Sequence, residues 1–157
     1  ALVSASRKMN YRPQLLEPVL KVNKAQAMKM VEMGEERLGN LKDKKVAVLG
    51  LAFKPNTNDL RGAPALKVIK ALLQKSASVR AYDPRAMPNA KQAFPEGVEY
   101  CDSAQKAIAD SDCVLILTEW AEFKDEELYR GQVVIDGRRV LDPQRAKALC
   151  DYQGVCW

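Results

Sequence analysis

The sequence of 157 residues contains no histidine. Without histidine the chain cannot form a Ser-His or Cys-His nucleophile pair, and zinc sites with imidazole ligands are excluded as well. Cysteine is scarce, and Cys101, Cys113, Cys150 and Cys156 form no C-x-x-C motif. We therefore predict no metal site, no disulfide scaffold and a reducing, cytoplasmic compartment.

Long apolar runs are also missing. The longest uninterrupted run, residues 114–117, is far too short to cross a membrane, and no N-terminal segment has the pattern of a signal peptide. We expect no membrane association. With 47% hydrophobic and 29% charged residues, the chain has the composition of a globular protein that can bury a core.

Positive charge exceeds negative charge by only five, with 25 Lys and Arg against 20 Asp and Glu. Residues 1–45 hold ten basic and five acidic side chains, whereas residues 46–157 hold fifteen of each. The whole excess therefore belongs to the N-terminal third. A net charge distributed in this way does not indicate a nucleic-acid-binding protein, and we expect no nucleic-acid partner.

The N-terminal third is expected to be helical. We predict a short helix within residues 1–9, a break at residues 11–13 and a long helix, residues 18–38, with Pro18 in its first turn. Within this helix, positions 16, 20, 23, 27, 30 and 34 are spaced like the seam of a coiled coil. The seam must pack either on the chain's own second domain or on another subunit or missing domain, and the pattern leaves both open.

From residue 45 onward, short apolar segments alternate with segments of helical periodicity. Strands are predicted at residues 45–51, 78–82, 98–101, 113–118 and 132–136, and helices at residues 63–76, 103–109, 123–129 and 143–150. This alternation predicts the α/β class, with a Rossmann-like doubly wound parallel sheet. We therefore divide the chain into a helical segment, residues 1–41, and an α/β domain, residues 45–157.

Ligands of open α/β sheets bind at the carboxyl ends of the strands, which selects the loops after positions 51, 82, 117 and 135. The first loop, GLAFKPNTNDLRGAP, lacks the G-x-G-x-x-G motif of a dinucleotide site. It offers Phe53 for stacking, Lys54 for a phosphate or a sugar hydroxyl, and Arg61, oriented by Asp59, for an anion. These residues could equally belong to an ordinary surface loop.

The last loop, DGRRVLD, places Arg138 and Arg139 directly after a buried strand. The two arginines either bind a ligand or pair with Asp136 or Asp142. Three or four cations around one crevice, on a domain without net charge, favour an anionic ligand.

Three other features are interpreted as structural. Asp83 stands where a dinucleotide fold has its ribose-binding acid, but it follows Gly50 by 33 residues, and the glycine motif is absent. Trp120 is expected to be a packing residue. The four cysteines are expected to be buried small hydrophobes, because none has a neighbouring base that would make it a nucleophile.

Three stretches, GLAFKPNTNDLRGAPA, DCVLILTEWAEF and DGRRVLD, resemble in order and spacing the C-terminal domain of the UDP-glucose/GDP-mannose dehydrogenase family. The similarity is greatest to its UDP-glucose 6-dehydrogenase type. The stretch ALVSASRKMNYRPQLLEPVLKVNKAQ resembles the end of the central helical domain of these enzymes, so the resemblance covers essentially the whole chain.

The resemblance implies roles for individual residues. Phe53 and Lys54 match a pair that contacts the nucleotide sugar, and Arg138 matches an arginine that contacts the UDP moiety. Arg139 is a less consistent match to the family, and Arg61 matches an arginine that reaches toward NAD. Residues 18–38 match the interdomain helix around which the dimer is built, which implies a homodimer.

The resemblance also implies an activity. Enzymes of this family oxidise the C6 hydroxyl of a nucleotide sugar to a carboxylate, using two NAD⁺ and a cysteine in a Gly-Gly-Ser-Cys-Phe-Pro-Lys-Asp motif. Neither that motif nor the glycine-rich NAD domain occurs in this sequence. We therefore expect a C-terminal piece of an NAD-dependent UDP-glucose 6-dehydrogenase, inactive alone and with no catalytic residue of its own.

Two alternatives remain open. The same scaffold could act on a UDP-N-acetylhexosamine or on GDP-mannose. The chain could also be a non-catalytic oligomerisation module that assembles through residues 18–38.

Overall fold

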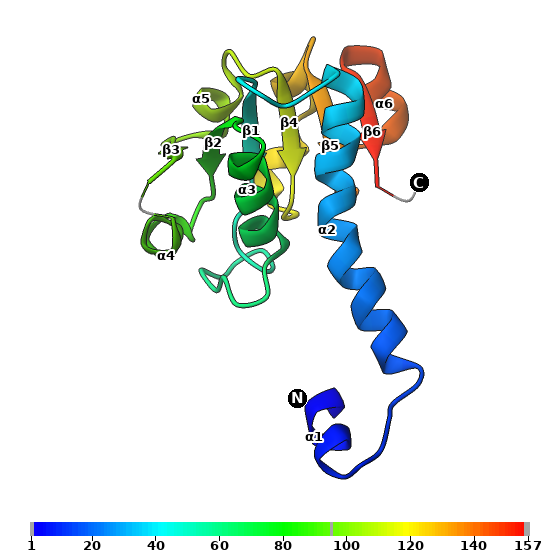
Figure 1. Ribbon diagram of the computed structural model, residues 1–157. Coiled ribbons are helices and arrows are strands. Elements are labelled where there is room, and N and C mark those ends of the chain that lie inside the picture. The colour runs from blue at the N-terminus through cyan, green and yellow to red at the C-terminus, as the bar shows by residue number, and fades with distance from the viewer. Residues whose placement is uncertain (1, 95, 156–157) are drawn as a thin grey trace.

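Six parallel strands form a single sheet in the computed structural model, which describes residues 2–94 and 96–155 (Figure 1). The strands are β1 (Lys45–Leu49), β2 (Ser78–Tyr82), β3 (Val98–Tyr100), β4 (Cys113–Ile116), β5 (Val133–Asp136) and β6 (Asp151–Gly154). Their order, β3-β2-β1-β4-β5-β6, is that of a doubly wound Rossmann-like sheet. The predicted fold class is confirmed, and the strand order reverses between β1 and β4.

Helices cover both faces of this sheet. They are α2 (Leu16–Leu38), α3 (Pro64–Gln74), α4 (Met87–Ala93), α5 (Ala104–Ile108) and α6 (Pro143–Leu149), with the 3₁₀ turns η1 (Ala121–Lys124) and η2 (Glu126–Tyr129). Helices α2 and α3 lie side by side on one face (Figure 1). On the other face, η2 contacts both α5 and α6.

Two elements were not predicted, and one was predicted wrongly. Helix α4 buries only Ala90, so its sequence has no amphipathic period. Strand β6 reads DYQG and lies at the sheet edge, where polar residues are tolerated. The helix expected at residues 123–129 is instead the pair of 3₁₀ turns, η1 and η2.

Helix α2 divides into a packed half and a protruding half (Figure 1). Ala27, Met30 and Val31 are buried against the α/β domain, whereas Val19 and Leu20 are more than half exposed. The predicted seam is therefore occupied by the chain's own domain only in its C-terminal half.

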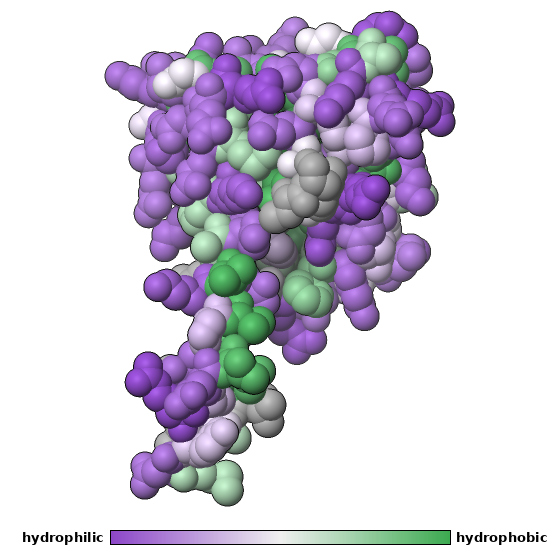
Figure 2. Space-filling view, turned by 90° about the vertical axis from the view of Figure 1, so that its right-hand side faces the viewer, coloured by the Kyte–Doolittle hydropathy of each residue, from purple (hydrophilic) through white to green (hydrophobic). Residues whose placement is uncertain are grey.

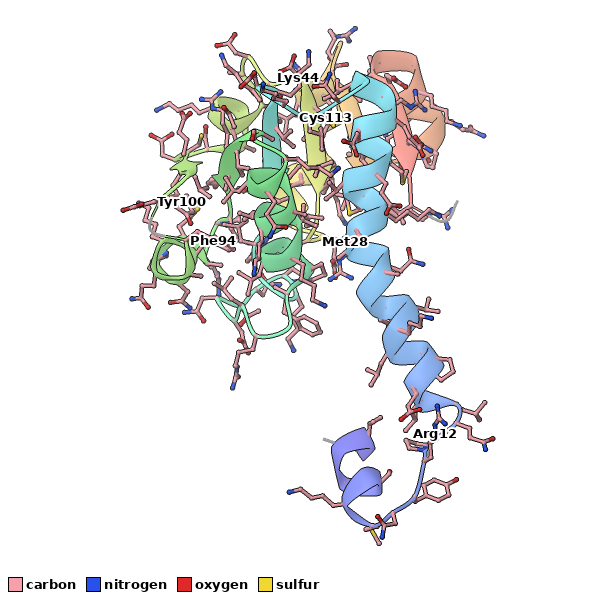
Figure 3. All side chains as sticks on the ribbon, viewed as in Figure 1. Arg12, Met28, Lys44, Phe94, Tyr100 and Cys113 are labelled. Carbon is pink, nitrogen blue, oxygen red and sulfur yellow. The ribbon has the colours of Figure 1, made fainter. Side chains whose placement is uncertain are left out.

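The short helix α1 (Leu2–Lys8) and the start of α2 lie far from the sheet. Arg12, between the two helices, is labelled at this distal end in Figure 3 and pairs there with Glu17 at 3.0 Å. Within residues 2–94 and 96–155, no helix combines the length and apolar character that a membrane span requires. The same residues contain no group of three or more Cys, Asp or Glu that could hold a metal ion.

Candidate functional site

The chain turns sharply where it leaves β1, at Gly50. This glycine has φ +87°, and a Cβ atom there would lie 2.5 Å from the Cβ of Thr118 and 2.7 Å from its backbone nitrogen. Only glycine fits a left-handed conformation in such close contact. The hydroxyl of Thr118 then donates to the carbonyl of Ala52 at 2.6 Å, which ties the loop after β1 to the end of β4.

Asp83, directly after β2, holds the start of the same loop. Its Oδ2 accepts the backbone N–H groups of Leu51 at 2.7 Å and Ala52 at 3.0 Å, and the indole N–H of Trp120 at 3.1 Å. Its Oδ1 accepts the backbone N–H groups of Arg85 and Ala86. Asp83 is only 1% exposed. The structural roles predicted for Asp83 and Trp120 are both confirmed.

Two contacts stabilise the rest of this loop, residues 50–63. The carboxylate of Asp59 accepts from Arg61 at 2.8 Å, and this hydrogen bond is the main reason why the pKa of Asp59 is lowered to about 2. The expected orientation of Arg61 by Asp59 is confirmed. At the loop tip, the side-chain amide of Asn89, on α4, donates to the carbonyl of Asn58 at 2.8 Å.

Arg138, after β5, bridges three loops. Its Nε donates to the carbonyl of Leu117 at 2.9 Å, and its Nη2 donates to the carbonyl of Phe53 at 3.0 Å. The same Nε lies 3.3 Å from the carboxylate of Glu119. The guanidinium is therefore fixed across the point where the strand order reverses.

The alternative in which the arginines pair with Asp136 or Asp142 is wrong for Arg138. Asp136 is fully buried, and its carboxylate accepts the backbone N–H groups of Arg138, Val140 and Leu141. Asp142 caps α6 by accepting two backbone N–H groups. Both acids are used by the backbone, which leaves the side chain of Arg138 to Glu119 and to backbone carbonyls.

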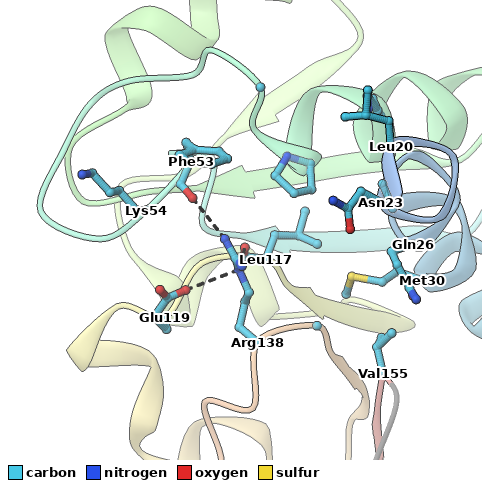
Figure 4. A pocket seen from close by; sticks show the side chains of 15 residues that line it. Leu20, Asn23, Gln26, Met30, Phe53, Lys54, Leu117, Glu119, Arg138 and Val155 are labelled. Carbon is cyan, nitrogen blue, oxygen red and sulfur yellow. Dashed lines mark hydrogen bonds and ion pairs between the residues drawn. The ribbon is translucent and has the colours of Figure 1, made fainter. Parts of the chain in front are cut away.

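These loops and α2 enclose a pocket of about 840 Å³ at the carboxyl edge of the sheet (Figure 4). This volume is within the range of small-molecule sites. The pocket is lined by Leu20, Asn23, Gln26, Ala27, Met30, Phe53, Lys54, Gly62, Pro64, Lys67, Leu117, Glu119, Gly137, Arg138 and Val155. Of the four loops selected from the sequence, those after β1, β4 and β5 contribute, and the loop after β2 does not.

Three of the five predicted site residues meet in this pocket. Phe53, which is 48% exposed, Lys54 and Arg138 line it together. Arg61 and Arg139 are not among the lining residues. The side chain of Arg61 is 91% exposed and pairs with Asp59, and Arg139 is exposed on a backbone with φ +53°.

Sequence reasoning missed the wall that α2 contributes and one cation, Lys67. Asn23 is a polar residue within the apolar seam of α2 and lines the pocket. Its place in the seam is the signal by which the sequence could have indicated this wall. Lys67 lies on α3 between the buried positions 65 and 68, and the apolar period that predicts this helix gives no sign that Lys67 faces the pocket. The pocket thus contains three basic side chains and one acidic side chain, Glu119.

The cysteines of the described residues are unsuited to nucleophilic chemistry. Cys101, Cys113 and Cys150 are free and buried, as predicted, whereas Cys156 lies outside the described residues. Burial raises the pKa of Cys113 to about 12 and that of Cys150 to about 11, so neither thiol ionises near neutral pH. None of the three lines the pocket.

The residues after β1 and β2 do not fit a dinucleotide such as NAD in the Rossmann manner. The loop after Gly50 carries Phe53 and Lys54 where that site needs glycines for the pyrophosphate. Asp83, which would accept the ribose hydroxyls, is buried and already accepts five N–H groups.

The fold and the pocket together define a doubly wound α/β domain with a predominantly basic ligand site at the reversal of its strand order. Residues 47–143 match the model of the UDP-glucose/GDP-mannose dehydrogenase family, UDP binding domain. The chain belongs to this family.

Similar proteins share nearly the whole of this chain. It is 43% identical to UDP-glucose 6-dehydrogenase AglM of Haloferax volcanii over 99% of this chain and 36% of the relative. It is 40% identical to UDP-glucose 6-dehydrogenase TuaD of Bacillus subtilis over 94% of this chain and 33% of the relative. A solved UDP-glucose dehydrogenase from Pyrobaculum islandicum superposes with a TM-score of 0.90 at 36% identity, covering all of this chain and 35% of that one. The chain therefore spans about a third of the length of these relatives.

Proposed function

We propose that this chain binds the UDP-sugar substrate within an NAD-dependent UDP-glucose 6-dehydrogenase, which oxidises UDP-glucose to UDP-glucuronate. The pocket formed by Phe53, Lys54 and Arg138 carries this proposal. It presents one aromatic ring and two cations at the position where α/β sheets bind ligands. The similarity to two curated UDP-glucose 6-dehydrogenases over at least 94% of the chain supports the choice of UDP-glucose.

Each residue has a distinct task in binding. Arg138, fixed by two carbonyls, presents its remaining N–H groups to a phosphate of the ligand. Lys54 adds a mobile positive charge for the second phosphate or a sugar hydroxyl. Phe53 offers an apolar ring face to the base or the sugar. Arg139 is assigned to the substrate as well, although it would have to approach from outside the pocket wall.

The oxidation itself requires groups outside this chain. NAD would supply the hydride acceptor, and we assign its binding to a separate domain, because the loops after β1 and β2 do not fit it. Arg61, with an almost fully exposed guanidinium, is suited to contact a cofactor held by that neighbouring domain. The chain alone should produce no NADH from UDP-glucose.

We also propose that the protruding half of α2 forms a homodimer interface. Leu15, directly before α2, and three residues on the helix, Val19, Leu20 and Val22, are all more than half exposed. Hydrophobic side chains follow this part of the helix in Figure 2. An exposed apolar stripe of this kind is typical of a surface that is covered in the assembled protein. Light scattering of the full-length protein tests this, and a monomer at high concentration would contradict it.

The three free cysteines of the described residues are consistent with a cytoplasmic location.

Titration calorimetry with UDP on the full-length protein tests the binding role. Lys54→Ala should weaken UDP binding by about tenfold, the usual scale for loss of a charged hydrogen-bonding partner. Lys70→Ala removes the same charge from an exposed position of α3 outside the pocket and should change the affinity little. Equal affinities for wild type and Lys54→Ala would refute the assignment. A turnover panel that includes UDP-N-acetylhexosamines and GDP-mannose identifies the sugar.

A further inference from the structure

One acidic side chain, Glu119, lines the otherwise basic pocket. Its carboxylate lies 3.3 Å from Nε of Arg138 (Figure 4), and the two side chains are 43% and 33% exposed. The buried acids Asp83 and Asp136 are used up by backbone N–H groups. Of the residues that line the pocket, Glu119 is therefore the carboxylate that an anionic ligand would meet.

Arg138 does not depend on Glu119 for its position. Backbone carbonyls of Leu117 and Phe53 accept from its Nε and Nη2, and its own backbone N–H is bound to Asp136. A guanidinium carries five N–H groups, of which these carbonyls engage two. The other three, together with the charge, are available to an anion. Glu119 adds an anion beside a side chain that is already held.

The remaining cations of the pocket are not neutralised in this way. Neither Lys54 nor Lys67 forms an ion pair with a described residue, whereas Arg138 has one with Glu119. A ligand with several negative charges can engage the two lysines at once. At Arg138, the same ligand meets a guanidinium whose charge is partly offset by the carboxylate beside Nε.

We propose that Glu119 is an affinity-limiting residue, whose carboxylate beside Nε of Arg138 offsets the charge that the free N–H groups of this guanidinium present to the phosphates of the bound ligand. This inference rests on the proposed UDP-sugar binding. The carboxylate lowers the affinity for the anionic ligand and speeds its release. Because the ion pair is partly exposed, its loss should change affinity by a factor of about two to five.

The test is titration calorimetry and stopped-flow release of UDP on the full-length protein, with uridine as the uncharged probe. Glu119→Gln keeps the side-chain shape and should bind UDP about two- to fivefold tighter and release it more slowly. Its affinity for uridine should equal that of wild type. A residue that only supported the fold would change both ligands in the same direction.

Two controls isolate the contact with Arg138. Glu122→Gln removes the same charge three residues away, from a side chain that does not line the pocket, and should leave UDP affinity unchanged. In an Arg138→Gln background, Glu119→Gln should no longer tighten UDP. A gain that persists in that background would overturn the action of Glu119 through Arg138.

The outcomes separate this inference from the proposed function. If Glu119→Gln leaves UDP affinity unchanged or weakens it while Lys54→Ala still weakens binding, Glu119 does not limit the affinity, and the inference alone is wrong. If wild type binds no UDP at all, the proposed function fails and the inference fails with it.

Discussion

Asp83 provides the sharpest test of how the site is built, through the substitution Asp83→Asn. The side chain changes little in shape, but one oxygen that accepts N–H groups becomes a donor. In its better orientation, the amide oxygen still faces the N–H groups of Leu51, Ala52 and Trp120. The new NH₂ group then faces the backbone N–H groups of Arg85 and Ala86, and these two donors lose their acceptor.

The loss of stability can be estimated from these two donors. A donor left without an acceptor in a buried site costs about 1–3 kcal/mol, so two donors cost about 2–6 kcal/mol. The total free energy of unfolding of a typical domain is only about 5–15 kcal/mol. Asp83→Asn should therefore remove a large fraction of the stability, and it should also weaken UDP binding, because Phe53 and Lys54 follow the two residues that Asp83 holds.

Urea unfolding followed by circular dichroism measures this effect. Asp142→Asn is the matched control, because Asp142 caps α6 through a single carboxylate oxygen. Asparagine is as good a cap as aspartate, so the control should lose less than about 0.5 kcal/mol. A loss below about 1 kcal/mol for Asp83→Asn would refute the assignment of Asp83 as the anchor of the loop after β1.

Three further predictions follow from the same contacts. Gly50→Ala should lower the free energy of unfolding, measured in urea, by about 2–5 kcal/mol, because the new Cβ meets Thr118 on a backbone with positive φ. Gly62→Ala is the control: this position has φ +75° but open space around its Cβ, so the free energy of unfolding should fall by only about 1 kcal/mol. Asp59 should titrate by carboxyl-detected NMR with a pKa of about 2. The stability that its ionised form contributes is complete above the pKa of the unfolded state, near 3.8, and is lost as the pH falls through 2. A titration midpoint at 3.8 in the folded protein would contradict the pairing with Arg61. Burial raises the pKa of Cys113 to about 12, so this thiol should resist a thiol reagent at pH 8 in the folded protein and react with it in urea. Fast labelling of Cys113 without urea would contradict its burial.

The central strands β1, β4 and β5 were predictable because they are short runs of apolar residues that are buried almost throughout. The five strands from β1 to β5 were found, with errors of one or two residues at their ends. Helix α4 was not predictable because only Ala90 of its residues is buried. Strand β6 was not predictable because its four residues, DYQG, form no apolar run, although Tyr152 enters the core. A pattern of apolar residues cannot reveal an element whose sequence does not contain one.

The candidate site was partly predictable for a similar reason. Parallel strands bring their carboxyl ends to one edge, so Phe53, Lys54 and Arg138 could be expected to meet. The spacing of apolar residues along α2 showed that one face is buried, but not which half packs on the sheet. Lys67 and the lining face of α2 therefore required the structure.

The basic character of the pocket arises from where the acids point. Residues 46–157 carry as many acidic as basic side chains, so net charge alone cannot create a basic site. Asp83 and Asp136, at the carboxyl ends of β2 and β5, turn inward and fix the backbone of the adjoining loops. Lys54 and Arg138, on those loops or beside them, are left facing the pocket. Asp83, which stands where a dinucleotide fold has its ribose-binding acid, here positions a loop, and we assign ligand binding to the cations.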